Sequence, residues 1–224
     1  MNWFNSKTGE SLVNFEQKIV QRYLEQKFGY YALQLGDHEK NLIQNAKVKH
    51  HILTSGKEKN INLDPEWLPF NFDSIDLTLC FHSFEGVENP QKFMDELYRV
   101  TISGGYVILC GFNLFSFAGL RKMIKFDNFS PWNDNFLSIT KIQNLLKQSG
   151  FTIRESKLEH FQPIFSDNKS SFNDKLEKIG NRWFPLLGNV YFLVAEKVTL
   201  SKIPKKQKWN RIKQRKTVIT KIYD

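Results

Sequence analysis

Two apolar segments joined by a helical pattern constrain the fold of this chain more than any other feature. Residues 75–81 (IDLTLCF) and 106–112 (YVILCGF) are mostly apolar, which is typical of strands buried on both faces of a parallel sheet. Residues 90–100 carry apolar side chains at helical spacing, and residues 103–105 (SGG) end that pattern. The chain is therefore predicted to contain a strand–helix–strand unit of an α/β fold, in which ligands bind beyond the carboxyl ends of the strands.

This region and its flanks carry a series of short motifs. They are Leu33-Gln34-Leu35-Gly36, Asp64-x-Glu66-x-Leu68-Pro69-Phe70, Ser74-Ile75-Asp76-Leu77, His82-x-x-Glu85, Glu96-x-x-Arg99-Val100, Gly104-Gly105 and Gly111-Phe112-Asn113. In this combination the chain resembles the class I S-adenosylmethionine (SAM) dependent methyltransferases, and within them a small-molecule-type (methyltransferase type 11-like) bacterial subgroup with a glycine-poor first loop. The resemblance implies SAM as the cofactor and methyl transfer as the reaction.

The resemblance also implies an architecture. It is a single-domain Rossmann-like α/β fold with a seven-stranded, mostly parallel sheet, an antiparallel strand seven and helices on both faces. Residues 1–200 are expected to form this domain, and residues 201–224 a basic C-terminal tail. Hydrophobic patterns predict a helix over residues 10–28 and further strands over residues 30–36, 48–55, 151–158 and 189–198. In class I methyltransferases an N-terminal helix often covers the active site, so the resemblance assigns that role to residues 10–28; packing on the sheet alone is the alternative.

The loop after the first strand is the weakest part of the cofactor signature. It keeps only Gly36, where related enzymes carry Gly-x-Gly-x-Gly so that backbone can approach the cofactor. Gln34 stands where many relatives have an acid, so we expect weaker polar support for this loop. After the second strand, only Glu58 offers an acid for the ribose hydroxyls. SAM has no pyrophosphate to cradle, so this loss is compatible with SAM binding.

Other cofactor contacts follow from the resemblance. It assigns Asp64 to the adenine amino group, a donor that a carboxylate accepts well. An exposed loop residue or a cap is the alternative for Asp64. The remaining residues of the cofactor site are then Gly36, His38, Leu68 and Phe81.

His82 follows the strand at residues 75–81 directly and is the candidate catalytic residue. A histidine there can act as a general base for an oxygen or nitrogen acceptor, because its unperturbed pKa lies near working pH. Stacking on the cofactor or a hydrogen bond to the loop are the alternatives for His82, and a place at the beginning of the next turn is the alternative for Glu85. Four apolar side chains are candidates for lining an acceptor pocket or for ordinary core: Phe112, Phe115, Phe117 and Trp132. Two basic residues are candidates for contacts to an anionic acceptor or for a solvated face: Arg121 and Lys122.

Charge is concentrated at one end of the chain. The formal net charge is +9, and residues 197–224 hold ten Lys or Arg and one acid, so the rest of the chain is neutral. Such a tail can hold RNA or an anionic surface by salt-sensitive attraction; a solvated chain end explains it equally well. A small molecule is the expected methyl acceptor.

Two cysteines and five histidines show no metal-ligand spacing, so no metal is expected. Cys80 and Cys110 are predicted to be reduced core residues. With no secretory signal and no apolar stretch long enough for a bilayer, the expected location is cytoplasmic.

Two other functions stay open: a methyltransferase-fold binding protein that has lost SAM and uses its basic tail, and a nicotinamide-dependent oxidoreductase, which the missing glycines disfavour.

Overall fold

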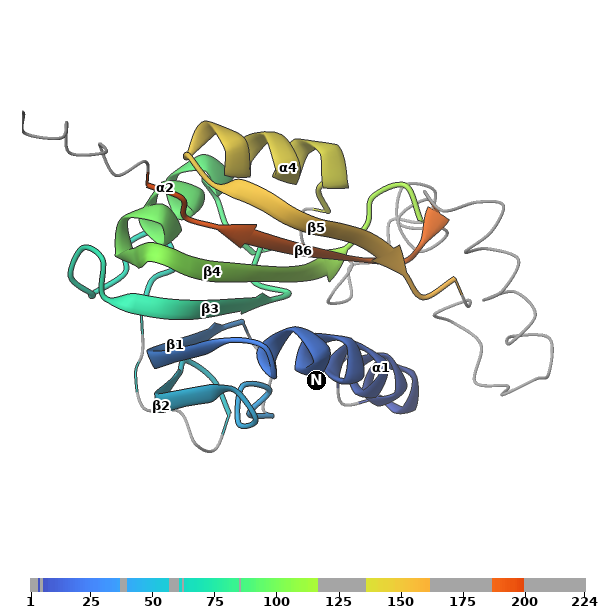
Figure 1. The fold of residues 1–224 in the computed structure, drawn as a ribbon. Helices are drawn as coiled ribbons and strands as arrows, with labels where there is room; N and C mark the ends of the chain where they lie inside the picture. Colours follow the sequence, from blue (N-terminus) through green and yellow to red (C-terminus); the bar gives the residue numbers. More distant parts are fainter. Residues whose placement is uncertain are drawn as a thin grey trace, which may run out of the picture.

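The computed structural model describes residues 4, 6–36, 40–56, 61, 63–84, 86–116, 136–161 and 187–199. These residues form one six-stranded sheet with helices on both faces (Figure 1). The strands are β1 (Phe28–Leu35), β2 (Lys47–Leu53), β3 (Ile75–Phe81), β4 (Thr101–Phe112), β5 (Thr152–Glu159) and β6 (Val190–Glu196), and the helices are α1 (Lys7–Leu24), α2 (Pro90–Val100) and α4 (Ile139–Gln148).

The sheet has the order β2-β1-β3-β4-β6-β5. Strands β2, β1, β3 and β4 pair in parallel, whereas β6 is antiparallel to both β4 and β5. This confirms the predicted α/β fold with a mostly parallel sheet and an antiparallel final strand. The strand order reverses beside β1, because β2 lies on one side of it and β3 on the other. Open α/β sheets bind their ligands at such a reversal, beyond the carboxyl ends of the strands.

The prediction of seven strands was wrong for the described residues, which contain six. The missing strand would fall between β2 and β3. In the described part of that stretch the chain makes one isolated bridge, between Asp64 and Trp67, and separate backbone hydrogen bonds from Ile61 to Leu53, from Asp73 to Arg99 and from Ser74 to Val100, which form no strand ladder. Pro65 and Pro69 lack the N–H that a strand ladder needs, and side chains of α2 satisfy part of this backbone instead.

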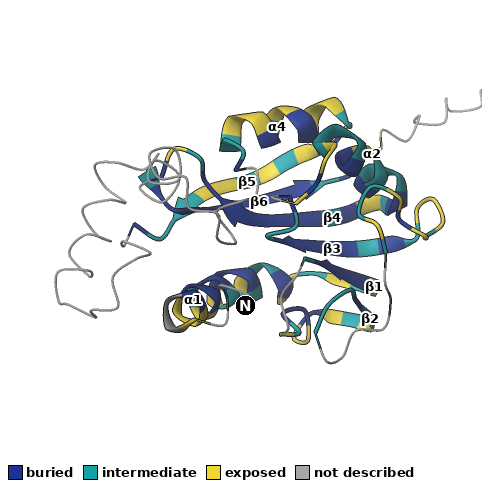
Figure 2. Ribbon diagram, turned by 180° about the vertical axis from the view of Figure 1, so that it is seen from behind, coloured by how far each residue is buried: buried dark blue, intermediate teal, exposed yellow. Residues whose placement is uncertain are grey.

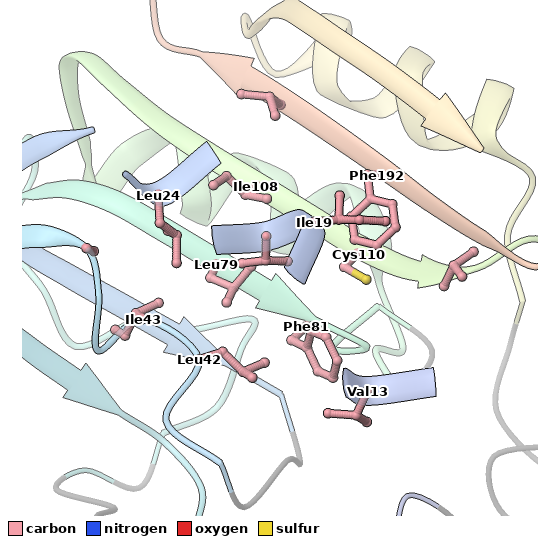
Figure 3. Close-up of a cluster of buried hydrophobic side chains, with 14 of the residues drawn as sticks. Val13, Ile19, Leu24, Leu42, Ile43, Leu79, Phe81, Ile108, Cys110 and Phe192 are labelled. Atoms are coloured by element: carbon pink, nitrogen blue, oxygen red, sulfur yellow. The ribbon is translucent and has the colours of Figure 1, made fainter. Parts of the chain in front are cut away.

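One face of the sheet is covered by α1 (Figure 3). The helix begins at the cap Ser6, whose hydroxyl accepts from the Gly9 N–H at 3.1 Å. It ends at Leu24, earlier than the predicted end at residue 28, because Phe28 already pairs with Lys47 as part of β1. The apolar face of α1 packs on side chains from the central strands: Leu12, Val13, Ile19, Val20 and Leu24 against Leu77, Leu79, Phe81, Ile108, Cys110 and Phe192.

The opposite face is covered by α2 and α4. Pro90 opens α2 after the cap Asn89, and Ser138 caps α4. The central strands β3 and β4 are buried on both sides, while β5 at the edge is largely exposed (Figure 2). The nearly continuous apolar sequence of β3 therefore has a physical cause, since both of its faces lie under helices.

Gln34, near the end of β1, supports the loop that follows it. Its side-chain amide donates to the Lys40 carbonyl at 2.9 Å, and its side-chain oxygen accepts from the Leu42 N–H at 2.8 Å. The expected loss of polar support at this position is therefore wrong. An acid can only accept, whereas the amide satisfies one acceptor and one donor of the loop.

Cys80 and Cys110 are free and buried, as predicted. Burial raises the pKa of the Cys80 thiol well above its usual value, so this thiol stays protonated. Among the described helices, none combines the length and the hydrophobicity that a membrane span requires.

Candidate functional site

The carboxyl ends of β1 and β3 meet at the strand-order reversal. Leu35 pairs with Cys80, so Gly36 and Phe81 are the residues that end the two strands side by side. Gly36 has a φ of 126°, and a Cβ placed on it would lie 1.9 Å from the Phe81 carbonyl oxygen. The glycine is thus required by the contact between the two strands, whatever else approaches it.

The segment that contains Asp64 and Leu68 is held against α2. Leu68 is buried, and its N–H donates to Glu96 Oε2 at 3.0 Å. Arg99 donates to the carbonyl oxygens of Leu68 at 2.7 Å and Phe70 at 2.8 Å, and also to Glu96. These hydrogen bonds from Arg99 hold the pKa of the Glu96 carboxyl below its usual value, so the pair stays charged. The Glu-x-x-Arg motif therefore fixes the Leu-Pro-Phe motif.

Asp64 itself is exposed. Its Oδ1 atom accepts from the Glu66 N–H at 2.8 Å, which is the turn-capping role considered as an alternative. A carboxylate has further lone pairs, so the cap leaves Asp64 able to accept from a ligand.

His82 has an unusual backbone conformation. Its φ is 48°, in the left-handed region that non-glycine residues rarely adopt. Side chains alternate between the faces of a strand, and Cys80 and Phe81 face opposite sides of the sheet. In a continued strand His82 would face α2. The left-handed turn instead brings its ring to the α1 side, next to Phe81.

On that side His82 meets a buried carboxylate. Its Nε2 atom lies 3.0 Å from Glu16 Oε1, and the two side chains are 3% and 0% exposed. The Cys110 thiol donates to the same Oε1 atom at 3.5 Å. The ligand atoms of these three residues lie within 4.8 Å of one another, close enough to share a metal ion.

Glu16 was missed by the sequence interpretation, although it left a signal. It lies four residues after Leu12 and three before Ile19, on the apolar face of α1. A charged residue on a buried helix face needs a partner. Its partners lie 66 and 94 residues away, so sequence spacing alone could not reveal the cluster.

Aromatic rings surround His82. The ring centroids of Phe4, Phe81 and Phe112 lie 5.0, 4.8 and 4.4 Å from that of His82, and Phe136 stacks on Phe112 at 5.1 Å. Of the pocket candidates, Phe112 is thus beside His82, whereas Phe115 is 62% exposed.

The structure therefore brings Gly36, Phe81 and His82 together at one rim. Leu68 belongs to the apolar cluster that also contains Leu35 and Cys80, and its backbone is bound to Glu96 and Arg99 near the end of α2. The other predicted positions lie outside the described residues: His38, Glu58, Glu85, Phe117, Arg121, Lys122, Trp132 and the tail at 201–224.

Comparison with known proteins identifies the domain. Residues 19–109 match the family model of the methyltransferase domain, and this segment runs from α1 through β4. Residues 19–109 are thus a match to the methyltransferase domain of the class I SAM-dependent family. The sequence resemblance to this family is thus confirmed, and proteins of this family use SAM as the methyl donor.

Two curated relatives of this methyltransferase chain carry no assigned function. It is 28% identical over 197 residues to the uncharacterized protein YafS of Escherichia coli K12, a match that covers 85% of this chain and 79% of YafS. It is 31% identical over 115 residues to the uncharacterized protein MJ1123 of Methanocaldococcus jannaschii, covering 51% of this chain and 52% of that protein.

Solved structures share the methyltransferase fold at low sequence identity. A putative methyltransferase from Bacillus halodurans superposes with a TM-score of 0.59 at 15% identity, covering 83% of this chain and all of that one. Geranyl diphosphate C-methyltransferase from Streptomyces coelicolor, solved with S-adenosyl-L-homocysteine, gives 0.57 at 10% identity and covers 87% of both chains. At such identities the likeness establishes the fold.

The donor set at this rim of the methyltransferase domain fits SAM. Asp64 presents an exposed carboxylate, the chemistry that an adenine amino group requires.

Proposed function

We propose that this methyltransferase transfers the methyl group of SAM to a small-molecule acceptor that binds beside His82. The observation that carries the proposal is the position of His82. It follows β3 directly at the strand-order reversal, and its strained backbone turns the ring into an aromatic enclosure. Backbone strain of this kind costs about 1–3 kcal/mol and clusters at functional sites.

The cofactor side of the proposed site is formed by loops at the ends of β1, β2 and β3. Gly36, Asp64, Leu68 and Phe81 are proposed to hold SAM, with His38 completing the set. Bound SAM supplies an electrophilic methyl group on a sulfonium, whose sulfur leaves as a neutral thioether. The work left to the protein is to align the acceptor with that methyl group and to exclude water. Such alignment is worth about 7–11 kcal/mol of a reaction barrier.

The acceptor side is proposed to be apolar. Phe4, Phe112 and Phe136 present flat apolar surfaces around the only polar ring in the group, His82. Pockets of this composition suit small apolar molecules that one polar group orients. The solved neighbour that acts on geranyl diphosphate also has a small-molecule substrate by its name, which agrees with this class.

Asp64 offers the direct test of the cofactor site. Calorimetric titration with SAM should show that Asp64→Ala weakens binding by roughly 1–3 kcal/mol, the usual cost of losing a hydrogen bond to a buried polar group. Asp64→Asn keeps an oxygen that can cap the Glu66 N–H, so it separates loss of charge from loss of the turn. Glu88→Gln, an exposed change nearby, is the matched control. Unchanged affinity in Asp64→Ala would remove Asp64 from the site.

A further inference from the structure

The buried carboxylate of Glu16 has no structural role that explains its cost. The residue is fully buried, and its Oε2 atom has no hydrogen-bond partner among the described residues. A buried ionisable group with an unsatisfied oxygen destabilises a fold. A leucine at this position would continue the apolar face of α1 without that cost.

Within the described part of the chain, the polar contacts of Glu16 involve one atom, Oε1. Oε1 lies within hydrogen-bond distance of His82 Nε2, at 3.0 Å, and receives the Cys110 thiol at 3.5 Å. With Glu16 ionised, its carboxylate can only accept, and the proton between the two residues then belongs to His82 Nε2. In the neutral ring Nδ1 is then the basic nitrogen. A carboxylate that fixes one tautomer of a histidine in this way prepares the ring to take up a proton.

We propose that Glu16 is a positioning residue that makes His82 the proton acceptor of the methyl transfer. This inference rests on the proposed function and narrows it: the acceptor carries an O–H or N–H that is lost on methylation. The acceptor oxygen or nitrogen bonds to the methyl carbon as the carbon–sulfur bond breaks, the electron pair of that bond stays on sulfur, and the acceptor proton passes to His82. The carboxylate of Glu16 then balances the charge of the imidazolium.

The side chains of Glu16, His82 and Cys110 are also of the kinds that bind zinc. Their geometry favours a Glu16–His82 pair that accepts a proton. Among the described residues only three ligands converge, and Oε1 is already engaged by both neighbours. Structural zinc sites are four-coordinate, so this set is incomplete as such a site. Metal binding is nevertheless an outcome that the experiment must detect.

The test is nitrogen NMR of the full chain with ¹⁵N-labelled histidine, with the His82 signals assigned by their loss in His82→Gln. Under mildly alkaline conditions the wild-type ring should be neutral, with its proton on Nε2 and that N–H shifted downfield and protected from exchange. Glu16→Gln should lose the downfield shift and the protection, whereas Glu25→Gln, an exposed change at the end of the same helix, should keep both. His82→Gln retains a donor for Glu16, so its thermal stability should stay close to that of the wild type.

Three results would overturn the proposal. One is a wild-type His82 with its proton on Nδ1, and another is a Glu16→Gln spectrum identical to that of the wild type. The third is disappearance of the Nε2–H signal when Zn²⁺ alone is added, which would assign the cluster to a metal. Titration of the same samples with S-adenosylhomocysteine tests the proposed function separately, because cofactor binding requires neither Glu16 nor the tautomer of His82.

Discussion

Gly36 and Phe81 touch through their backbones, so that the ends of β1 and β3 meet with no side chain between them. This contact defines the rim at which His82 turns toward α1. It also explains why one glycine remains in a loop that is otherwise poor in glycine. Gly36 is the glycine that remains, because the contact between β1 and β3 requires a glycine at that position.

Gly36→Ala should therefore destabilise the fold as well as the site. The new Cβ meets the Phe81 carbonyl, and a φ of 126° is unfavourable for any side chain. We expect a loss of roughly 3 kcal/mol or more in the free energy of unfolding, measured by urea denaturation. Gly104→Ala separates the two causes, since Gly104 also has a positive φ but has open space around its Cβ position; it should cost about 1–2 kcal/mol. Equal losses in the two variants would contradict the role of the Phe81 contact.

Gln34→Glu should weaken the protein although it introduces the residue type expected at this position in related sequences. The acid keeps an acceptor for the Leu42 N–H but sets a carboxylate against the Lys40 carbonyl, at a position that is 2% exposed. The Gln34–Lys40 hydrogen bond is part-buried, and losing it while a buried carboxylate oxygen faces the carbonyl should cost about 1–3 kcal/mol. Chemical denaturation at neutral pH measures this loss, and a variant as stable as the wild type would show that the Lys40 bond is dispensable.

Arg99→Lys should loosen the Leu68–Phe70 segment and lower the affinity for SAM. Lysine has one charged nitrogen and cannot donate to two carbonyl oxygens and Glu96 in a fixed plane, as Arg99 does. We expect a loss of about 1–3 kcal/mol in stability, with weaker binding of S-adenosylhomocysteine in calorimetry. Lys147→Ala, an exposed change on α4, is the control. If both variants bind the ligand as the wild type does, the anchoring of this segment has no part in cofactor binding.

His160 should make the protein sensitive to acid. Burial lowers the pKa of His160 to about 4, and the ring lies beside Phe15 and Asn189. The unfolded chain, with an ordinary histidine pKa near 6.5, takes up a proton before the folded one does. This contribution to stability is therefore complete above about pH 6.5 and is lost as the pH falls toward 4, by up to about 3 kcal/mol.

His160→Gln removes this titration. Unfolding measured between pH 7 and pH 4 should show a smaller loss of stability in the variant than in the wild type, while carboxylates contribute equally to both. Parallel curves for the two proteins would mean that His160 is not buried in its neutral form.

Much of the fold follows from local sequence patterns. The apolar run at residues 75–81 is continuous because β3 lies under helices on both faces, and α2 carries its own N-cap. The stop predicted at residues 103–105 was wrong, because α2 ends at Val100 and those residues lie inside β4. The false prediction of a seventh strand has an equally physical cause. The Asp64–Phe70 segment is anchored by Arg99 and Glu96, and such side-chain support of a backbone cannot be recognised from periodicity.

The site was harder to predict than the fold. His82 was found because it follows a buried strand, and its left-handed backbone was not foreseen. Glu16 was missed because its meaning depends on a partner that folding brings from 66 residues away. A single charged residue inside the apolar stripe of α1 was the available signal.

The most direct test of the account is calorimetric titration of the intact protein with S-adenosylhomocysteine. A class I methyltransferase that retains its cofactor site should bind one molecule per chain with micromolar affinity, and SAM should bind at the same site and compete with it. Absence of detectable heat and of thermal stabilisation at millimolar concentrations of both ligands would contradict the proposed methyltransferase activity and leave only the fold.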